Sequence, residues 1–212
     1  MIYLPPDPSD PIRQGDIFRD IPRADISLNQ LAEIQDNHLV KTTWLGILSS
    51  GASDTTIAAK IKCVDAIIIT QDCDALRSPD ISLCEIVDFK QLFPGDTPGS
   101  ISKWVKTIIR QSKINLKWFY LPPSNEVGFN EKKVVDFQTI IRINREDMEQ
   151  LRQDYRIGRL NDVATEHFRE RLGEFFRRYP YNEWYPFNKE EFEKYREIQS
   201  SSADIRPYEY QK

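Results

Sequence analysis

The sequence predicts an α+β fold, with a β-rich, partly barrel-like front half and helices concentrated in the C-terminal half. Three observations predict this class. Residues 38–89 are rich in β-branched side chains and turn signals, which is typical of strands. From about residue 99 apolar residues recur at helical spacing, most clearly over residues 162–178. The chain has 212 residues, of which 40% are hydrophobic, so it is long enough for one substantial core.

The beginning of the chain is dominated by proline. Five of the 13 prolines lie within the first 23 residues. Because proline lacks a backbone N–H, we expect residues 1–22 to form an extended lead-in without regular ladders. We expect residues 23–180 to form a single α+β domain, followed at 181–212 by a C-terminal helix and a polar tail.

The sequence of the front half predicts a series of strands. Residues 38–50 and 55–70 are β-like and flank a turn at 51–54. The second segment is too long for one typical strand, so we expect a break near Val64 and Asp65. Residues 66–70 are apolar on both faces, which predicts a central buried strand, and residues 81–89 form the next strand.

The second half mixes helices with strands. We expect a helix from about Ser100, strands over 113–120 and 134–143, and a short helix over 145–153 that Asn144 caps. Two amphipathic helices follow, over residues 162–178 and 189–198. The first of these has an apolar stripe formed by Val163, Phe168, Leu172, Phe175 and Phe176.

Composition favours a cytoplasmic protein without a cofactor. No apolar run reaches the roughly 18 residues of a membrane span, so we expect no membrane partner. Cys63, Cys73 and Cys84 are an odd number of cysteines, which we interpret as free thiols. The phosphate-binding, zincin and hydrolase motifs are missing from the sequence, so no cofactor is expected.

The candidate catalytic residues surround Cys73, directly after the predicted buried strand. As a nucleophile, Cys73 would need His38 or His167 as its base. Its neighbours Asp72 and Asp74 disfavour a thiolate, because a negative charge raises the pKa of a nearby thiol. A structural cysteine, flanked by carboxylates that bind turn amides, is the competing interpretation, and a binding role is the third.

The three cysteines do not have the spacing of a metal site. A hairpin centred on Arg77 would set Cys84 opposite Thr70, out of register with Cys73. No arrangement of this kind gathers the ligands as a CxxC pair does, so we expect no metal.

The candidate partner-binding residues form a basic and aromatic face. Residues 97–125 contain five basic residues and no acidic one. This combination provides phosphate contacts and stacking platforms, or a surface for an acidic protein. The candidates are Lys103, Trp104, Lys106, Arg110, Lys113, Lys117 and Trp118. Further basic residues that could extend the face are Arg142, Arg145, Arg152, Arg156 and Arg159. The alternative interpretation is a solvated helix face, with the tryptophans directed toward the core.

Three segments carry a resemblance to known proteins: RQGDIF at 13–18, TQDCD at 70–74, and the region from Arg169 to Arg178. Together they resemble a diffuse group of uncharacterised prokaryotic proteins with a QGD opening and an (S/T)-Q-x-C-D strand end. The resemblance covers about residues 13–180 and implies a defence or stress-response setting. The opening also resembles that of PemK-like endoribonuclease toxins, which implies an SH3-like barrel. Val64 and Asp65 stand where those toxins have arginine and proline, and this difference argues against nuclease activity.

These observations lead to one main functional hypothesis and two alternatives. We expect a non-enzymatic interaction module or complex subunit that binds an acidic partner, protein or nucleic acid, through its basic-aromatic face, with a hetero-complex as one form. The alternatives are a cysteine-dependent hydrolase using Cys73 and a degenerate PemK-like ribonuclease. The net charge of −4 does not exclude a polyanion, because residues 1–36 alone carry seven acids and three bases. We expect this acidic front to be able to cover the basic face.

Overall fold

The computed structural model describes residues 2–51, 53–92, 97–109 and 117–177. The chain divides into two compact units, Met1–Phe175 and Phe176–Lys212, and the fold below is that of the first. The helix expected at 189–198 lies outside the described residues.

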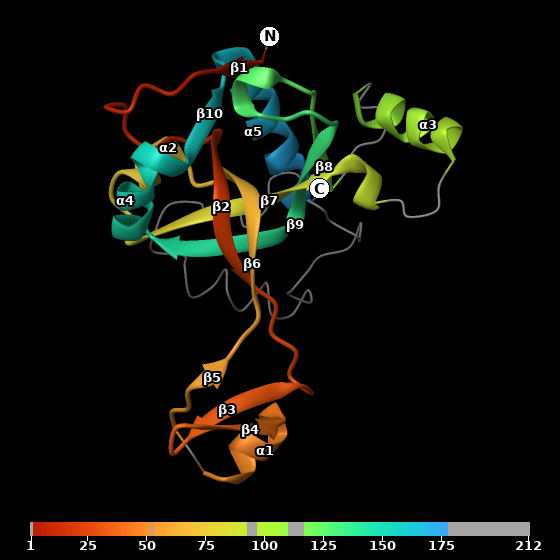
Figure 1. The fold of residues 1–212 in the computed structure, drawn as a ribbon. Coiled ribbons are helices and arrows are strands. Elements are labelled where there is room, and N and C mark those ends of the chain that lie inside the picture. The colour runs from red at the N-terminus through yellow and green to blue at the C-terminus, as the bar shows by residue number, and fades with distance from the viewer. Residues whose placement is uncertain (1, 52, 93–96, 110–116, 178–212) are drawn as a thin grey trace, which may run out of the picture. The chain divides into compact units, whose positions relative to one another are not determined.

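The main element is a seven-stranded sheet in which neighbouring strands are antiparallel (Figure 1). Its order is β1-β10-β2-β6-β7-β9-β8. The strands are β1 (Tyr3–Leu4), β2 (Asp16–Ala24), β6 (Ile61–Ile68), β7 (Asp80–Asp88), β8 (Trp118–Leu121), β9 (Lys133–Asn144) and β10 (Arg156–Leu160). The α+β class is confirmed. The sheets are open and do not close into a barrel, and the SH3-like comparison stays a prediction.

The central strand is the one predicted from residues 66–70. β6 is fourth of the seven strands, and its residues Ala66, Ile67 and Ile68 are fully buried. The expected break at residues 64–65 is wrong, because the ladder runs through both: Val64 pairs with Ile21 and Asp65 with Ile86. The interruption lies instead between β5 (Ile57–Ala58) and Ile61.

A second, three-stranded sheet has the order β4-β3-β5, with β3 at Leu31–Gln35 and β4 at His38–Thr42. The expectation of a strand over all of 38–50 is wrong, because α1 occupies Trp44–Ser49. The side-chain oxygen of Thr43 accepts a hydrogen bond from the Gly46 N–H at 3.1 Å. This N-cap begins a helix where β-branched composition had favoured extended chain.

The longer helices lie in the C-terminal half, as predicted. They are α3 (Pro98–Ile109), α4 (Arg145–Tyr155) and α5 (Asp162–Phe176). The cap of α4 is confirmed, since Asn144 Oδ1 accepts a hydrogen bond from the Glu146 N–H at 2.8 Å. Short helical turns are α2 (Asp72–Ala75), η1 (Phe89–Leu92) and η2 (Asn125–Val127).

The predicted stripe of α5 is only partly correct. Phe168 and Leu172 are buried, but Val163 is 68% exposed. Ala164 and Arg171 are buried in addition. The buried face of α5 is therefore slightly rotated from the face that the sequence predicts.

The lead-in contributes strands to the main sheet despite its prolines. β1 pairs with β10, and β2 lies between β10 and β6. The prolines at 5–11 fall outside both strands, and Pro22 removes only one donor from β2.

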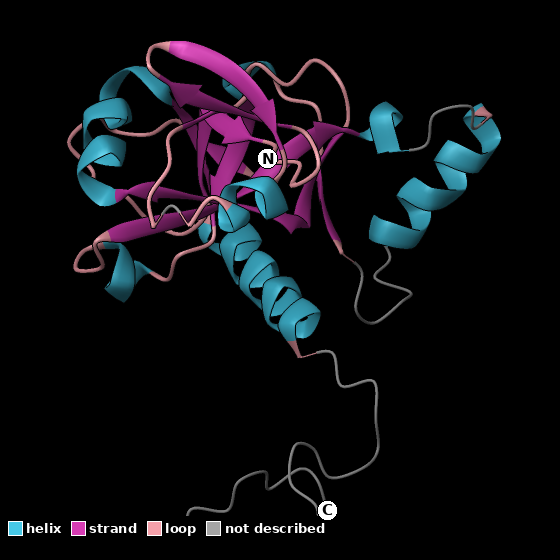
Figure 2. Cartoon of the chain, turned by 90° about the horizontal axis from the view of Figure 1, so that it is seen from below, coloured by secondary structure: helices cyan, strands magenta, loops and turns pink. Residues whose placement is uncertain are grey.

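Apolar side chains cover both faces of the seven-stranded sheet. On β6, Ile67 belongs to one core cluster, and Ala66 and Ile68 belong to another, as the alternation of a strand requires. Phe168 of α5 joins the first cluster and Met148 of α4 the second. In Figure 2, α5 is the helix that leads into the grey C-terminal trace. Within the described residues, no helix is long and apolar enough to cross a membrane.

Candidate functional site

The three segments that carry the resemblance meet in the structure. The Gln14 N–H donates to Asp72 Oδ1 at 2.8 Å, and Gln14 Nε2 donates to the carbonyl of Ile69 at 2.8 Å. Arg169 of α5 donates from Nε to Gln14 Oε1 at 2.8 Å and forms an ion pair with Asp72 at 2.6 Å. The opening, the end of β6 and α5 are thus joined through one glutamine, one aspartate and one arginine.

Gly15 allows the chain to pass through this junction. Its N–H donates to the carbonyl of Ile68 at 3.0 Å, and its own carbonyl accepts from the Leu160 N–H at 3.0 Å. Its φ of +89° lies in the region that favours glycine. A Cβ here would lie 3.3 Å from Thr165 Oγ1, so glycine meets both a conformational and a steric requirement.

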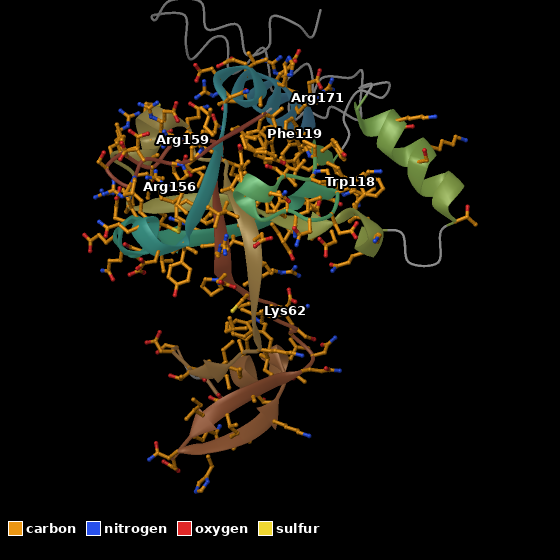
Figure 3. All side chains as sticks on the ribbon, turned by 45° about the horizontal axis from the view of Figure 1, so that its top comes forward. Lys62, Trp118, Phe119, Arg156, Arg159 and Arg171 are labelled. Atoms are coloured by element: carbon orange, nitrogen blue, oxygen red, sulfur yellow. The ribbon has the colours of Figure 1, made fainter. Side chains whose placement is uncertain are left out.

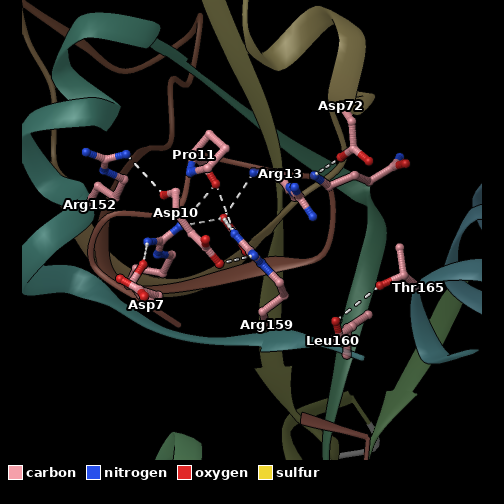
Figure 4. A network of polar contacts seen from close by, with 12 residues as sticks. Asp7, Asp10, Pro11, Arg13, Asp72, Arg152, Arg159, Leu160 and Thr165 are labelled. Atoms are coloured by element: carbon pink, nitrogen blue, oxygen red, sulfur yellow. Dashed lines mark hydrogen bonds and ion pairs between the residues drawn. The ribbon is translucent and has the colours of Figure 1, made fainter. Parts of the chain in front are cut away.

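Asp16 anchors a buried ion-pair network that includes Asp10 and Arg159, both of which are labelled in Figure 4. Its side chain is inaccessible to solvent, and Arg156 lies 3.1 Å away with a side chain that is only 1% exposed. Arg159 binds Asp16 and also Asp10, at 2.8 Å from the latter. Burial lowers the pKa of Arg159, but the hydrogen bonds and negative charges of the two aspartates outweigh it, so that pKa is raised overall. The QGD opening is therefore a structural joint, built from a buried charge that is fully paired.

An open polar cleft of about 540 Å³ lies beside this joint, between the end of β6 and the start of β7. The charged side chains that line it are paired within the chain: Arg77 with Asp74 at 2.9 Å, and Asp80 with Arg142. The Thr70 Oγ1 accepts from the Ser82 N–H at 2.7 Å. The charged groups of the cleft are thus each in an ion pair, and Gln71, Ser78 and Ser82 supply further polar side chains.

The structure brings only part of the predicted catalytic set together. Cys73 is exposed on α2, between Asp72, which Arg169 binds, and Asp74, which Arg77 binds. His38 belongs to β4 of the other sheet, and His167 is exposed on α5. Among the described residues, no hydrogen bond joins Cys73 to a histidine, so the geometry shows no nucleophile with its base.

Cys63 and Cys84 behave differently from each other. Cys84 is buried opposite Ile67, not opposite Thr70, and burial, with a smaller effect of Asp136, raises the pKa of its thiol to about 12. Cys63 is exposed. The part of the chain that the structure describes holds no group of three or more histidine, cysteine, aspartate or glutamate residues suited to a metal ion.

The predicted basic-aromatic face lies on α3 and β8, which are in contact. Lys103 and Lys106 are exposed on α3, three residues apart. The Lys117 ammonium lies 4.7 Å from the ring centroid of Trp118, and this tryptophan packs against the cluster around Phe89 (Figure 3). The side chain of Trp104 and the residues Arg110 and Lys113 lie outside what the structure describes.

Of the five arginines that could extend this face, Arg156 and Arg159 do not, because both side chains are largely buried. Arg142, Arg152, Arg156 and Arg159 are each paired with an aspartate or glutamate of the same chain. The acidic lead-in likewise pairs with β10 through Asp10 and Asp16. The charges of Arg156 and Arg159 are thus internal to the fold, whereas Arg142 is 72% exposed beside Asp80.

Sequence reasoning missed the roles of Gln14, Asp16 and Arg169. Their segments were singled out by resemblance, but no spacing rule connects residues that lie 55 to 155 positions apart. A buried partner for Asp16 could have been sought in the arginine pair of residues 156–159, which flank a glycine. No protein-family model matches this chain, and no curated protein matches it.

Proposed function

We propose that this protein is a non-enzymatic interaction module that binds an acidic partner through the basic face formed by α3 and β8. The observation that carries the proposal is the pair of exposed lysines, Lys103 and Lys106, on a helix without an acidic residue. Residues 97–125 contain no acid to neutralise them locally.

The contrast with the other basic residues supports this choice of surface. Eleven lysines and arginines form ion pairs with acids of the same chain, from Arg23 in β2 to Arg171 in α5. Seven other basic residues of the described chain, such as Lys60 and Lys132, have no ion pair, but they do not lie in an acid-free stretch of 29 residues. Among the described residues, no ion pair involves Lys103, Lys106 or Lys117 either. Their charge is therefore available to a partner, and a face of this kind attracts polyanions at a distance.

Other features support the cellular setting that we propose for the protein. The resemblance to prokaryotic proteins supports a defence or stress-response system. Three free thiols support a cytoplasmic location. We prefer this function to a hydrolase because Cys73 has no hydrogen-bonded histidine among the described residues. We prefer it to a ribonuclease because Val64 and Asp65 stand where PemK-like toxins have arginine and proline.

The test compares two double charge reversals by fluorescence anisotropy. The test variant carries Lys103→Glu and Lys106→Glu, and the matched control carries Lys60→Glu and Lys132→Glu, which change the net charge equally at exposed lysines elsewhere. The probes are a labelled single-stranded RNA of about 20 nucleotides and labelled polyglutamate, titrated at several salt concentrations. A protein that binds through this face loses about tenfold or more in affinity only in the test variant, and its salt dependence becomes weaker.

The probe that binds identifies the class of partner. Preference for RNA indicates nucleic acid, and preference for polyglutamate indicates an acidic protein. Equal loss in both variants, or no binding of either probe at low salt, contradicts the proposal.

A further inference from the structure

The small sheet module (residues 26–60, formed by β3, β4, β5 and α1) has more apolar surface than core. Leu31 and Ile47 are its only buried large apolar side chains among the described residues. Leu39 is 66% exposed and Leu45 is 73% exposed. The exposed set consists of Ile26, Leu28, Ile34, Leu39, Val40, Trp44, Leu45 and Leu48.

The small sheet module therefore needs another surface to cover its exposed apolar side chains. A folded segment of fewer than about 40 residues rarely stabilises itself without a disulfide, a metal or association with another chain. The cysteines of the described chain are free and lie outside residues 26–60. Exposed apolar side chains in such a cluster are typical of an interaction surface.

The edge of the small sheet offers hydrogen-bonding groups in a defined pattern. β4 is the outer strand, with β3 on one side. Asp36 and Asn37 link the two strands with φ values of 47° and 63°, which is a two-residue turn of type I′. The residues that flank this turn, Gln35 and His38, form a hydrogen-bonded pair, and such pairs alternate along the ladder.

Every second residue of β4 therefore forms its backbone hydrogen bonds with β3. His38, Val40 and Thr42 direct their backbone groups toward β3, and Leu39 and Lys41 direct theirs away from it. The free edge therefore has two residues with outward N–H and C=O groups, centred on Val40.

We propose that β4 pairs with β4 of a second copy of this chain across a two-fold axis at Val40. In this antiparallel register Val40 faces its equivalent, and Leu39 of each copy faces Lys41 of the other. The residues with outward groups are then opposite each other and exchange both hydrogen bonds, as the ladder requires. The two three-stranded sheets become one continuous sheet.

The charges of the module are compatible with a second copy as the occupant, and the outward backbone groups of β4 are self-complementary about Val40. Lys41 is the only lysine, arginine or acid in β4, and it lies opposite Leu39, so like charges do not face each other. Residues 26–60 contain three acids, Glu33, Asp36 and Asp54, and two lysines, so two modules repel each other little. Ile34 and Leu39 are cross-strand partners on one face, and in this register Leu39 of one copy lies diagonally opposite Leu39 of the other.

Light scattering and sedimentation of the full chain test the proposal over about 1–100 µM. The expected mass is twice 24.9 kDa. Lys41→Pro removes an outward N–H while leaving the bonds to β3, so this variant becomes monomeric. Lys41→Ala keeps the N–H and remains a dimer. A monomeric native chain at the highest concentration, or a dimer that Lys41→Pro does not affect, overturns the proposal.

A second pair of variants gives an answer even if the proline disturbs the hairpin. Leu39→Lys places a lysine opposite Lys41 of the other copy, and Leu39→Glu places a carboxylate there. We expect the dimerisation of the lysine variant to be weaker than that of the glutamate variant by about tenfold or more. The two-fold axis creates two equivalent pairs of residues 39 and 41, and both are repulsive in the lysine variant and attractive in the glutamate variant. If the two variants dimerise equally, β4 does not pair with β4 of the second copy. The alternatives are then assembly through α1 or binding of an unrelated chain.

Discussion

Asp16 illustrates how a single residue can determine the local structure of the lead-in. Its carboxylate accepts hydrogen bonds from the Arg13 N–H, Arg156 and Arg159, which belong to segments at opposite ends of the first unit. Because both Asp16 and Arg156 are almost inaccessible to solvent, removal of Asp16 leaves the buried charge of Arg156 without its carboxylate partner.

We therefore expect Asp16→Ala to lower the free energy of unfolding by about 3–5 kcal/mol. Asp74→Ala is the matched control, because it also removes an aspartate from an arginine pair, but there the side chains are 46% and 74% exposed. The control should lower the free energy of unfolding by about 0–1 kcal/mol. Urea denaturation of both variants measures the difference, and similar losses would show that the Asp16 network adds little stability.

At the scale of elements, the accuracy of sequence-based prediction depended on how local the determining contacts are. The buried strand at residues 66–68 and the cap at Asn144 were predicted because their signals lie within a few residues. β10 was missed because two of the five residues in its sequence, RIGRL, are charged, and these arginines are neutralised by aspartates about 140 residues away. α1 was missed because a side-chain cap at Thr43 outweighed a strand-like composition.

The candidate site shows the same limit. The sequence located Lys103 and Lys106 correctly on one helix, because helical spacing is local. It could not show that Arg142 or Arg159 was already paired, since the partners Asp80 and Asp16 lie 62 and 143 positions away. Whether a charge is available to a partner is thus a property of the fold.

One close approach between elements gives a double-mutant test. Gly158 in β10 faces Val127 of η2, and a Cβ on Gly158 would overlap the Val127 Cγ1. Val127 is 2% exposed and has little space to move. We expect Gly158→Ala to cost about 1–3 kcal/mol of unfolding free energy through overpacking.

Val127→Ala removes the overlapping methyl group and supplies the partner for a double-mutant cycle. We expect the double variant to be more stable than the sum of the two single losses predicts, by about 0.5 kcal/mol or more. Thermal or urea unfolding of the four proteins measures this coupling. Strict additivity would mean that the cost of Gly158→Ala arises in the backbone of β10 and not from contact with η2.

At the scale of the whole molecule, the net charge of −4 conceals an uneven distribution. Asp10 and Asp16 of the acidic front are bound to Arg159, whereas the basic stretch at 97–125 has no acid of its own. A long-range ion-pair network therefore connects the start of the chain to β10. The average charge predicts neither arrangement, because it contains no information about which charges meet.

The stability of the whole chain should also depend on pH in the alkaline range. Burial raises the pKa of Cys84 from 9.0 to about 12, and burial also raises the pKa of Tyr3 and of Tyr120. Between pH 9 and 12 the folded protein keeps the Cys84 proton and the unfolded chain releases it. Unfolding therefore releases protons, and the free energy of unfolding falls as pH rises, by about 1.4 kcal/mol per pH unit for this one group.

Cys84→Ala isolates that contribution, and Cys63→Ala, at an exposed thiol, is its control. We expect the Cys84 variant to be less stable at neutral pH, because it leaves a cavity, but to lose stability less steeply above pH 9. The tyrosines keep part of the slope in every variant. Urea denaturation at intervals from pH 7 to about 11 gives the curves. If the Cys84 variant runs parallel to the native protein across this range, the thiol ionises as easily in the folded chain as in the unfolded one. The core around β7 would then admit water to a side chain that the structure places out of its reach.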